Sequence, residues 1–174
     1  LDRRGVEDGA MSDPSMVTET DLIHLRRCVE LAAEAVAAGD EAFGSVLVGA
    51  DGTVLAEGRN EVAGGDGTRH PELELARWGA QHLAVEDRPG ATVYTSGEHC
   101  AMCSAAHAWA GLGRIVFATS VEQTARWSAE LGAPASPVAP LPIRQVAPGI
   151  PTAGPVDELA DEVRALHRRA LGRG

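Results

Sequence analysis

Two short motifs constrain the fold of this chain more than any other feature. The first is His-Pro-Glu at positions 70–72 and the second is Cys-Ala-Met-Cys at positions 100–103, with 27 residues between them. Each motif follows a loop and precedes apolar residues at helical spacing, so each is expected to open a helix. Two cysteines three positions apart share one helix face, and the free N–H groups of a helix N-terminus favour thiolates. The fold is therefore expected to place His-Pro-Glu at the N-terminus of one helix and the two cysteines at the N-terminus of another.

Hydrophobic periodicity predicts alternating helices and strands. Asp51-Gly52 is a strong hairpin signal between two short strands, and Pro71 suits the first position of a helix. The expected order is a helix at 21–39, strands at 43–50 and 53–58, a helix from 71, a strand at 91–95, a helix at 100–110, a strand at 114–119, and helices at 121–131 and 156–171. This order predicts an α/β fold with one mixed sheet between helices, and parallel pairing after the hairpin.

A chain of 174 residues suffices for one domain with a hydrophobic core. We predict a flexible N-terminal extension at residues 1–16, which are polar and lack periodicity. The main domain is expected at residues 17–132. Residues 133–174, with most of the ten prolines and a last helix, are expected to form an irregular wrap that is part of the same domain.

Charge and composition exclude several classes of protein. The formal net charge of −10 argues against binding to a phosphate backbone, which depends on cationic side chains. All fifteen basic residues are Arg, and the absence of Lys excludes Schiff-base chemistry and a Walker-type phosphate loop. Neither a signal peptide nor an apolar run long enough to span a membrane is seen, and three Cys make no even disulfide framework. We therefore expect a cytoplasmic protein in which Cys28 is a buried core thiol.

The two motifs together contain a set of zinc ligands. Thiolate and imidazole are the ligands that Zn²⁺ prefers, so His70, Cys100 and Cys103 are the candidate metal ligands. A structural zinc site is normally closed by four protein ligands, whereas three leave a position for water, as in catalytic sites. Glu72 lies two residues after His70 and is the candidate catalytic acid and base, because a carboxylate there can move protons without binding the metal.

These residues resemble the cytidine deaminase superfamily, whose pattern is H-x-E followed by P-C-x-x-C. The resemblance covers about residues 17–132 and is nearest to the guanine deaminase and nucleobase deaminase branch. It implies a three-layer α/β/α sandwich with a mixed five-stranded sheet, a zinc cofactor and a homodimer. The chain departs from the pattern at His99, where the family usually has Pro. We expect His99 to contact the substrate or a metal ligand, with a structural role or metal ligation as alternatives.

The same branch suggests the groups that hold the substrate. Phe43 resembles the Phe that packs on the base, Trp109 the tryptophan of guanine deaminases, and Asn60 an Asn that hydrogen-bonds the base. The alternatives are core aromatics for Phe43 and Trp109, and a turn or cap residue for Asn60. Glu98 is expected either to contact an exocyclic group or to remain solvated.

The favoured function is zinc-dependent hydrolytic deamination of a free nucleobase or a related aminated heterocycle: guanine, a cytosine-like base or an amino-triazine. The alternatives are a tRNA-specific adenosine deaminase and a catalytically inactive, zinc-stabilised binding protein. The net charge of −10 disfavours the first, and the presence of Glu72 disfavours the second. His107 is expected to be a satisfied core histidine, and His24, His82 and His167 to have structural or surface roles.

Overall fold

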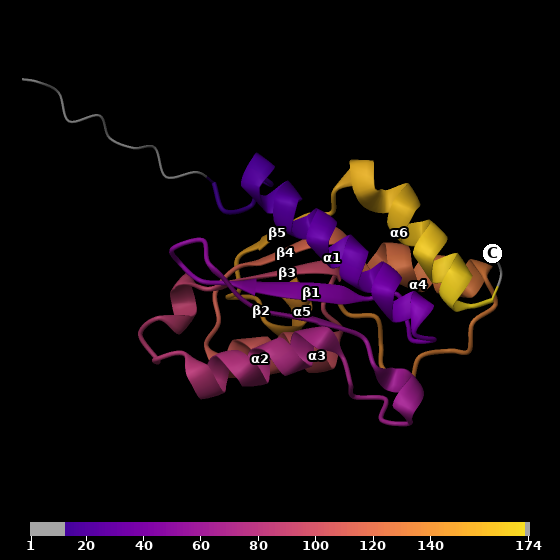
Figure 1. The fold of residues 1–174 in the computed structure, drawn as a ribbon, viewed down its shortest axis with the longest axis horizontal. Helices are drawn as coiled ribbons and strands as arrows, with labels where there is room; N and C mark the ends of the chain where they lie inside the picture. Colours follow the sequence, from indigo (N-terminus) through magenta and orange to yellow (C-terminus); the bar gives the residue numbers. More distant parts are fainter. Residues whose placement is uncertain (1–12, 173–174) are drawn as a thin grey trace, which may run out of the picture.

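A mixed five-stranded sheet lies at the centre of the computed structural model, which describes residues 13–172 (Figure 1). The strands are ordered β2-β1-β3-β4-β5, with β1 antiparallel to both β2 and β3. β3 pairs parallel with β4, and β4 parallel with β5, so the expected parallel pairing after the hairpin is found. The strands are β1 (Gly44–Val48), β2 (Val54–Arg59), β3 (Thr92–Gly97), β4 (Ile115–Thr119) and β5 (Thr152–Ala153).

Helices cover both faces of the sheet, which confirms the expected three-layer α/β/α sandwich. α1 and α6 lie side by side on one face, with α4 against α6, while α2 and α3 pack on the opposite face, with α5 against α3 (Figure 1). The helices are α1 (Glu19–Ala37), α2 (Pro71–His82), α3 (Ala101–Ala110), α4 (Val121–Glu130), α5 (Ile143–Val146) and α6 (Asp157–Ala170). No helix among residues 13–172 has the length and apolar character needed to cross a membrane.

Alternation along the strands decides which side chains meet which layer, because successive strand residues point to opposite faces. Val46, Tyr94 and Val116 are buried in the core beneath α1 and α6. Leu47 and Val93 belong to the second core, beneath α2. By the same alternation, Ser45 and Thr95 face the layer formed by α2 and α3. Ser45 lies near the N-terminal end of β1, and Thr95 lies beside it, near the C-terminal end of β3.

The start of α1 is tied to the sheet by a network around Asp21. Thr18 and Asp21 form a capping box, each side chain accepting a hydrogen bond from the other's backbone N–H. Asp21 Oδ1 also accepts from Tyr94 Oη at 2.9 Å and from Arg114 Nη1 at 2.9 Å. Arg114 donates in addition to the carbonyls of Pro14 and Met16 at 2.8 Å each. Residues 13–16 of the predicted extension therefore have defined contacts, and residues 1–12 lie outside the described part.

The Pro-rich segment is more regular than its composition indicates. It contains α5 and β5, and β5 supplies the fifth strand through pairs of Thr152 with Ile115 and Ala153 with Val116. A two-residue strand between Pro151 and Pro155 has too few residues to show alternation, which explains why periodicity predicts no strand there. α6 then returns to pack on α1 and β4, so Ala153 of β5 and Leu159, Val163 and Leu166 of α6 share one core with α1.

Candidate metal centre

Two helix N-termini meet beside the end of β3, and each carries metal-ligand side chains. His70 is the N-cap of α2, and Pro71 occupies the first helical position, where its missing N–H costs no hydrogen bond. Cys100 is the N-cap of α3, and Cys103 lies in the first turn. The carbonyls of His70 and Cys100 begin the two helices by accepting from the N–H groups four residues on, at 3.2 and 2.8 Å. Local helix geometry thus directs the three side chains to one place.

The structure brings the three predicted ligands together. His70 Nδ1 lies 3.7 Å from Cys100 Sγ and 3.6 Å from Cys103 Sγ. One ligand atom from each of the three residues lies within 4.8 Å of the others. Cys103 is buried, and His70 and Cys100 are partly buried. Two sulfurs and an imidazole nitrogen at this separation can surround one ion at ordinary zinc–sulfur and zinc–nitrogen distances of about 2.3 and 2.0 Å.

The protonation chemistry of the three groups also fits a soft divalent cation. The hydrogen bond from Cys103 and the contact with His70 together outweigh the opposing effect of burial and lower the pKa of Cys100 to about 4. The same hydrogen bond, with burial and the nearby Glu72, raises the pKa of the Cys103 thiol. The contact with Cys100 raises the pKa of His70 despite its burial. The site thus gathers negative charge on sulfur, which a bound cation would neutralise while releasing protons.

Glu72 lies against the ligands without being one of them. Its carboxylate is buried, and Oε2 lies 3.9 Å from Cys103 Sγ. Oε1 accepts a hydrogen bond from Thr95 Oγ1 at 2.9 Å and lies 3.3 Å from Ser45 Oγ. Burial raises the pKa of Glu72, although hydrogen bonds and the charge of His70 oppose that shift. A carboxyl group with a raised pKa next to a metal site suits a group that must both accept and return a proton.

Sequence reasoning does not predict Ser45 and Thr95 as part of this site. Both hydroxyls are fully buried, and each lies in a strand that also carries buried apolar residues. The signal that could have found them is the polar residue itself, since a buried hydroxyl needs a hydrogen-bond partner. Which partner it meets depends on the pairing of β1 with β3, and register is not visible in either segment alone.

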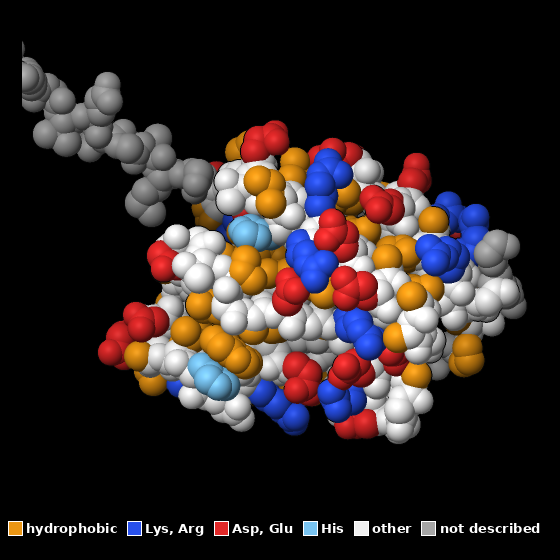
Figure 2. Space-filling view, viewed as in Figure 1, with side chains coloured by type: hydrophobic (Ala, Val, Ile, Leu, Met, Phe, Trp, Pro, Cys, Tyr) orange, Lys and Arg blue, Asp and Glu red, His pale blue; other side chains and the backbone are white. Residues whose placement is uncertain are grey.

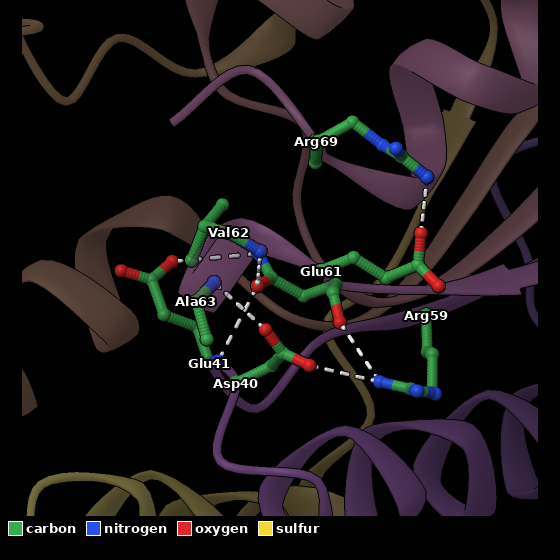
Figure 3. A network of polar contacts seen from close by, with 8 residues as sticks. Asp40, Glu41, Arg59, Glu61, Val62, Ala63 and Arg69 are labelled. Atoms are coloured by element: carbon green, nitrogen blue, oxygen red, sulfur yellow. Dashed lines mark hydrogen bonds and ion pairs between the residues drawn. The ribbon is translucent and has the colours of Figure 1, made fainter. Parts of the chain in front are cut away.

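The loop that leads to His70 is held by a polar network (Figure 3). Asp40 accepts from Arg59 Nη1 at 2.9 Å and from the Ala63 N–H at 2.8 Å. Asn60, predicted to bind the base, is buried, and its Oδ1 accepts from the N–H groups of Glu41 at 3.3 Å and Val62 at 3.1 Å. Asn60 Nδ2 lies 3.5 Å from a Glu41 carboxylate oxygen. The oxygen of the Asn60 amide therefore organises the loop, and its NH₂ group, which donates to Glu41, has one further N–H left to donate.

Phe43, the second predicted substrate contact, lies over the end of β3. Its ring is so close to Gly97 that a Cβ at that position would lie 2.8 Å from Phe43 Cε1. On its other side the ring meets His167 of α6, with the ring centroids 5.0 Å apart. His167, expected to have a structural or surface role, is buried between Phe43 and Trp127. The C-terminal helix thus contacts a residue that packs on the end of β3.

The remaining three predicted contacts take up other positions. Both carboxylate oxygens of Glu98 accept from main-chain N–H groups, those of Val121 and Ile143, at 2.9 Å. They thereby join the starts of α4 and α5. His99 is fully buried with its ring centroid 5.5 Å from that of His107. His107 Nε2 donates to the Gly113 carbonyl at 2.7 Å, but its buried Nδ1 has no hydrogen-bond partner among the described residues, so His107 is a core histidine that is only half satisfied. Trp109 is 90% exposed near the end of α3 opposite to Cys100. Among the described residues, none of these three side chains forms a hydrogen bond or an ion pair with Glu72 or the ligands.

The arrangement of the centre is that of the zinc-dependent deaminases, in which a Glu that does not bind the metal moves protons beside it. Comparison with known proteins agrees. A model of the cytidine and deoxycytidylate deaminase zinc-binding region matches residues 18–119, more than half of the chain. The chain belongs to this family, and zinc is therefore the metal that His70, Cys100 and Cys103 fit.

The similar proteins include deaminases of free bases and tRNA-specific adenosine deaminases. A probable cytosine deaminase of Schizosaccharomyces pombe is 33% identical over 116 residues, which cover 67% of this chain and 70% of the relative. Guanine deaminase of Bacillus subtilis is 38% identical over 96 residues, covering 54% of this chain and 61% of the relative, which is less than two thirds of its length. The structure of guanine deaminase from Nitrosomonas europaea shares the fold, with a TM-score of 0.64 at 20% identity over 90% of this chain and 86% of that one.

Proposed function

We propose that this protein is a zinc-dependent hydrolytic deaminase of a free nucleobase or a related aminated heterocycle. One observation carries the proposal: the buried carboxylate of Glu72 lies 3.9 Å from Cys103 Sγ, beside a centre with three protein ligands. A structural zinc site has no use for an acid at that position. Cytosine and guanine deaminases among the relatives support a nucleobase as the substrate.

Zinc, held by His70, Cys100 and Cys103, would supply the positive charge that lets water lose a proton near neutral pH. Glu72 accepts that proton at its carboxylate and delivers it to a ring nitrogen, which keeps it. Once the oxygen has added to the amine-bearing carbon, Glu72 takes the second proton from that oxygen and delivers it to the leaving amine. The C–N bond to the exocyclic amine breaks, a C=O forms at the same carbon, and ammonia leaves. Burial of Glu72 keeps bulk water away from the proton while it is held.

The groups proposed to hold the ring are Phe43 and Asn60. Phe43 is half-buried and offers an aromatic face beside the end of β3. Asn60 offers the remaining N–H of its side-chain amide, because its oxygen is taken by the loop and its other N–H donates to Glu41. Guanine, a cytosine-like base and an amino-triazine all present an amidine-like carbon to such a site.

We propose a small molecule rather than tRNA as the substrate. The net charge is −10, and Figure 2 shows Arg side chains interleaved with acidic ones across the face over α1. Arg27, for example, is paired with Glu57 at 2.7 Å and with Glu30 at 3.0 Å. Cations that are paired in this way give little net attraction for a phosphate backbone.

We also propose a cytoplasmic homodimer. The cytoplasmic location rests on free thiols at Cys28, Cys100 and Cys103, which a reducing compartment preserves. The dimer rests on Trp109, whose exposed ring lines a surface depression with Ala105, Ala108 and Val146. Light scattering after gel filtration measures the mass directly: a monomeric wild-type protein at working concentration contradicts the dimer, and a dimer that Trp109→Ala dissociates places it at this surface.

Ammonia release from a panel of rings tests the function. The panel contains guanine, cytosine, 5-methylcytosine, adenine, their nucleosides and amino-triazines, with zinc content measured in parallel. Ammonia from one class of ring, abolished in Glu72→Ala while zinc stays bound, supports the proposal and names the substrate. A zinc-loaded wild-type protein that is inactive on the whole panel contradicts it, and tRNA is then the next substrate to assay.

A further inference from the structure

The two oxygens of Glu72 have different surroundings. Oε2 lies on the side of the ligands, 3.9 Å from Cys103 Sγ. Oε1 points into the sheet, where Thr95 Oγ1 lies at 2.9 Å and Ser45 Oγ at 3.3 Å. Ser45 and Thr95 are direct partners in the antiparallel pairing of β1 and β3, so their side chains stand next to each other on one face. One carboxylate oxygen is thus enclosed by hydroxyls from two strands.

Counting protons shows how this small network can be satisfied. Each hydroxyl has one proton to donate. Thr95 Oγ1 lies 2.9 Å from both Glu72 Oε1 and the Gly97 carbonyl, and Ser45 Oγ lies 2.9 Å from Thr95 Oγ1. If Thr95 donates to Glu72, Ser45 donates to Thr95; if Thr95 donates to Gly97, Ser45 is free to donate to Glu72. In both arrangements Oε1 keeps one hydrogen bond, which makes the two hydroxyls mutual substitutes.

We propose that Thr95 and Ser45 are positioning residues for Glu72: they hold Oε1 against the sheet so that Oε2 faces the reacting atoms. The proposal rests on the proposed function only for its effect on turnover. Both hydroxyls are fully buried and the Glu72 side chain is nearly so. Water therefore cannot freely take the place of a lost hydroxyl, and losing one costs a hydrogen bond to Glu72. A carboxylate that loses these partners can rotate, and proton transfer depends steeply on such alignment.

Kinetics of four variants test the proposal on the ring that the wild-type protein deaminates best. Thr95→Val removes the closer hydroxyl at nearly constant volume, and we expect kcat to fall by about tenfold with KM changed by less than about twofold. Ser45→Ala alone should have a smaller effect, because Thr95 still donates. The double variant should lose about a hundredfold or more, exceeding the product of the single effects, since neither hydroxyl can then replace the other. Thr95→Ser should restore most of kcat.

A matched control separates positioning from general damage to a buried strand. Thr119 in β4 is also fully buried, and its hydroxyl donates to the Ser96 carbonyl at 2.8 Å. Thr119→Val therefore removes a buried threonine hydroxyl that serves the main chain. Equal losses of kcat in Thr119→Val and Thr95→Val, or a Thr95→Ser protein as slow as Thr95→Val, would overturn the proposal.

Crystal structures give a second readout that does not depend on activity. We expect the Glu72 carboxylate to keep its position in Thr95→Ser and to move in the double variant, with metal content unchanged. An unmoved Glu72 in the double variant contradicts positioning whatever the kinetics show. If the wild-type protein deaminates no ring but Glu72 moves as expected, the proposed function fails and the positioning role stands.

Discussion

The ring of His167 packs edge-on against the ring of Phe43, with the centroids 5.0 Å apart and the planes at 76°. The family model ends at residue 119, so this contact joins the part of the chain that matches the family to a helix that lies outside it. Gly97 supports Phe43 from the other side. The position of the proposed base-stacking ring therefore depends on both the end of β3 and the docking of α6.

Gly97→Ala tests whether Phe43 holds the substrate. The added Cβ would lie 2.8 Å from Phe43 Cε1, so the ring must shift. We expect KM to rise by about three- to tenfold through weaker stacking, and stability to fall by about 1–3 kcal/mol from the crowding. Steady-state kinetics and urea unfolding measure the two effects. Gly149→Ala is the control, because nothing lies within 4 Å of its added Cβ. An unchanged KM would remove Phe43 from the substrate site.

His167 makes the stability of the fold depend on pH. Burial lowers its pKa to about 4 from an ordinary value near 6.5, and its Nε2 has no hydrogen-bond partner in the described residues. The unfolded chain then takes up a proton that the folded chain excludes. The stability contributed by a neutral His167 is fully present above pH 6.5 and is lost as the pH falls toward 4.

The expected loss is about 1.4 kcal/mol per pH unit for each such histidine. Burial lowers the pKa of His107 to about 4 as well, and that of His99 well below 6.5, so three residues contribute as the pH falls below 6.5. His167→Leu should reduce the slope of unfolding free energy against pH by one proton while leaving the contributions of His107 and His99. Urea titrations between pH 7.5 and 5 measure both slopes. If unfolding free energy falls with pH equally in the wild-type protein and in His167→Leu, His167 is protonated equally in the folded and unfolded states, which contradicts the prediction.

The place of Glu72 beside His70, Cys100 and Cys103 could be predicted from sequence because each position depends on a single local event. Pro71 starts α2 just after His70, and the N-terminus of α3 places Cys100 and Cys103 within one turn. Helix periodicity spans many residues and therefore predicts such starts well.

The unpredicted parts depend on contacts between distant segments. Ser45 reaches Glu72 only through the pairing of β1 with β3, and His167 reaches Phe43 only because α6 returns across α1. Glu98 lies next to the motif, yet its oxygens bind the N–H groups of Val121 and Ile143. No local pattern encodes which backbone lies opposite a side chain, so these roles need the three-dimensional arrangement.

Cys103→Ala should abolish zinc binding. It removes one of three ligands, and the remaining His70 and Cys100 make a weak site. Cys28→Ala is the matched control: its thiol is fully buried in the core beneath α1, away from the ligand cluster. We expect that variant to keep its zinc and to lose about 1 kcal/mol of stability from the cavity. Metal analysis after dialysis decides the matter, and full zinc content in Cys103→Ala would contradict the ligand assignment.

Asp21→Asn should be strongly destabilising although it lies outside the centre. Asp21 is nearly buried, and burial would raise its pKa, but hydrogen bonds from Arg114, Thr18 and Tyr94 outweigh this and leave the pKa below its ordinary value. The charged form thus stabilises the fold above about pH 4, and this contribution is lost as the pH falls through the folded pKa. Replacing the carboxylate by an amide leaves Arg114 without its counter-charge, at a cost of about 2–4 kcal/mol.

Tyr94→Phe separates the ion pair from the hydrogen bond. It removes the donor that lies 2.9 Å from Asp21 Oδ1 while the pair of Asp21 with Arg114 remains. We expect a loss of about 1 kcal/mol, clearly smaller than that of Asp21→Asn. Urea unfolding at pH 7 and at pH 3 should show the difference between Asp21→Asn and the wild-type protein shrinking at the lower pH, since below about pH 3.8 the unfolded wild-type chain takes up a proton on Asp21 and the charged form stabilises the fold less. A difference that stays constant between the two pH values would mean that packing, and not the charge of Asp21, holds the start of α1 on the sheet.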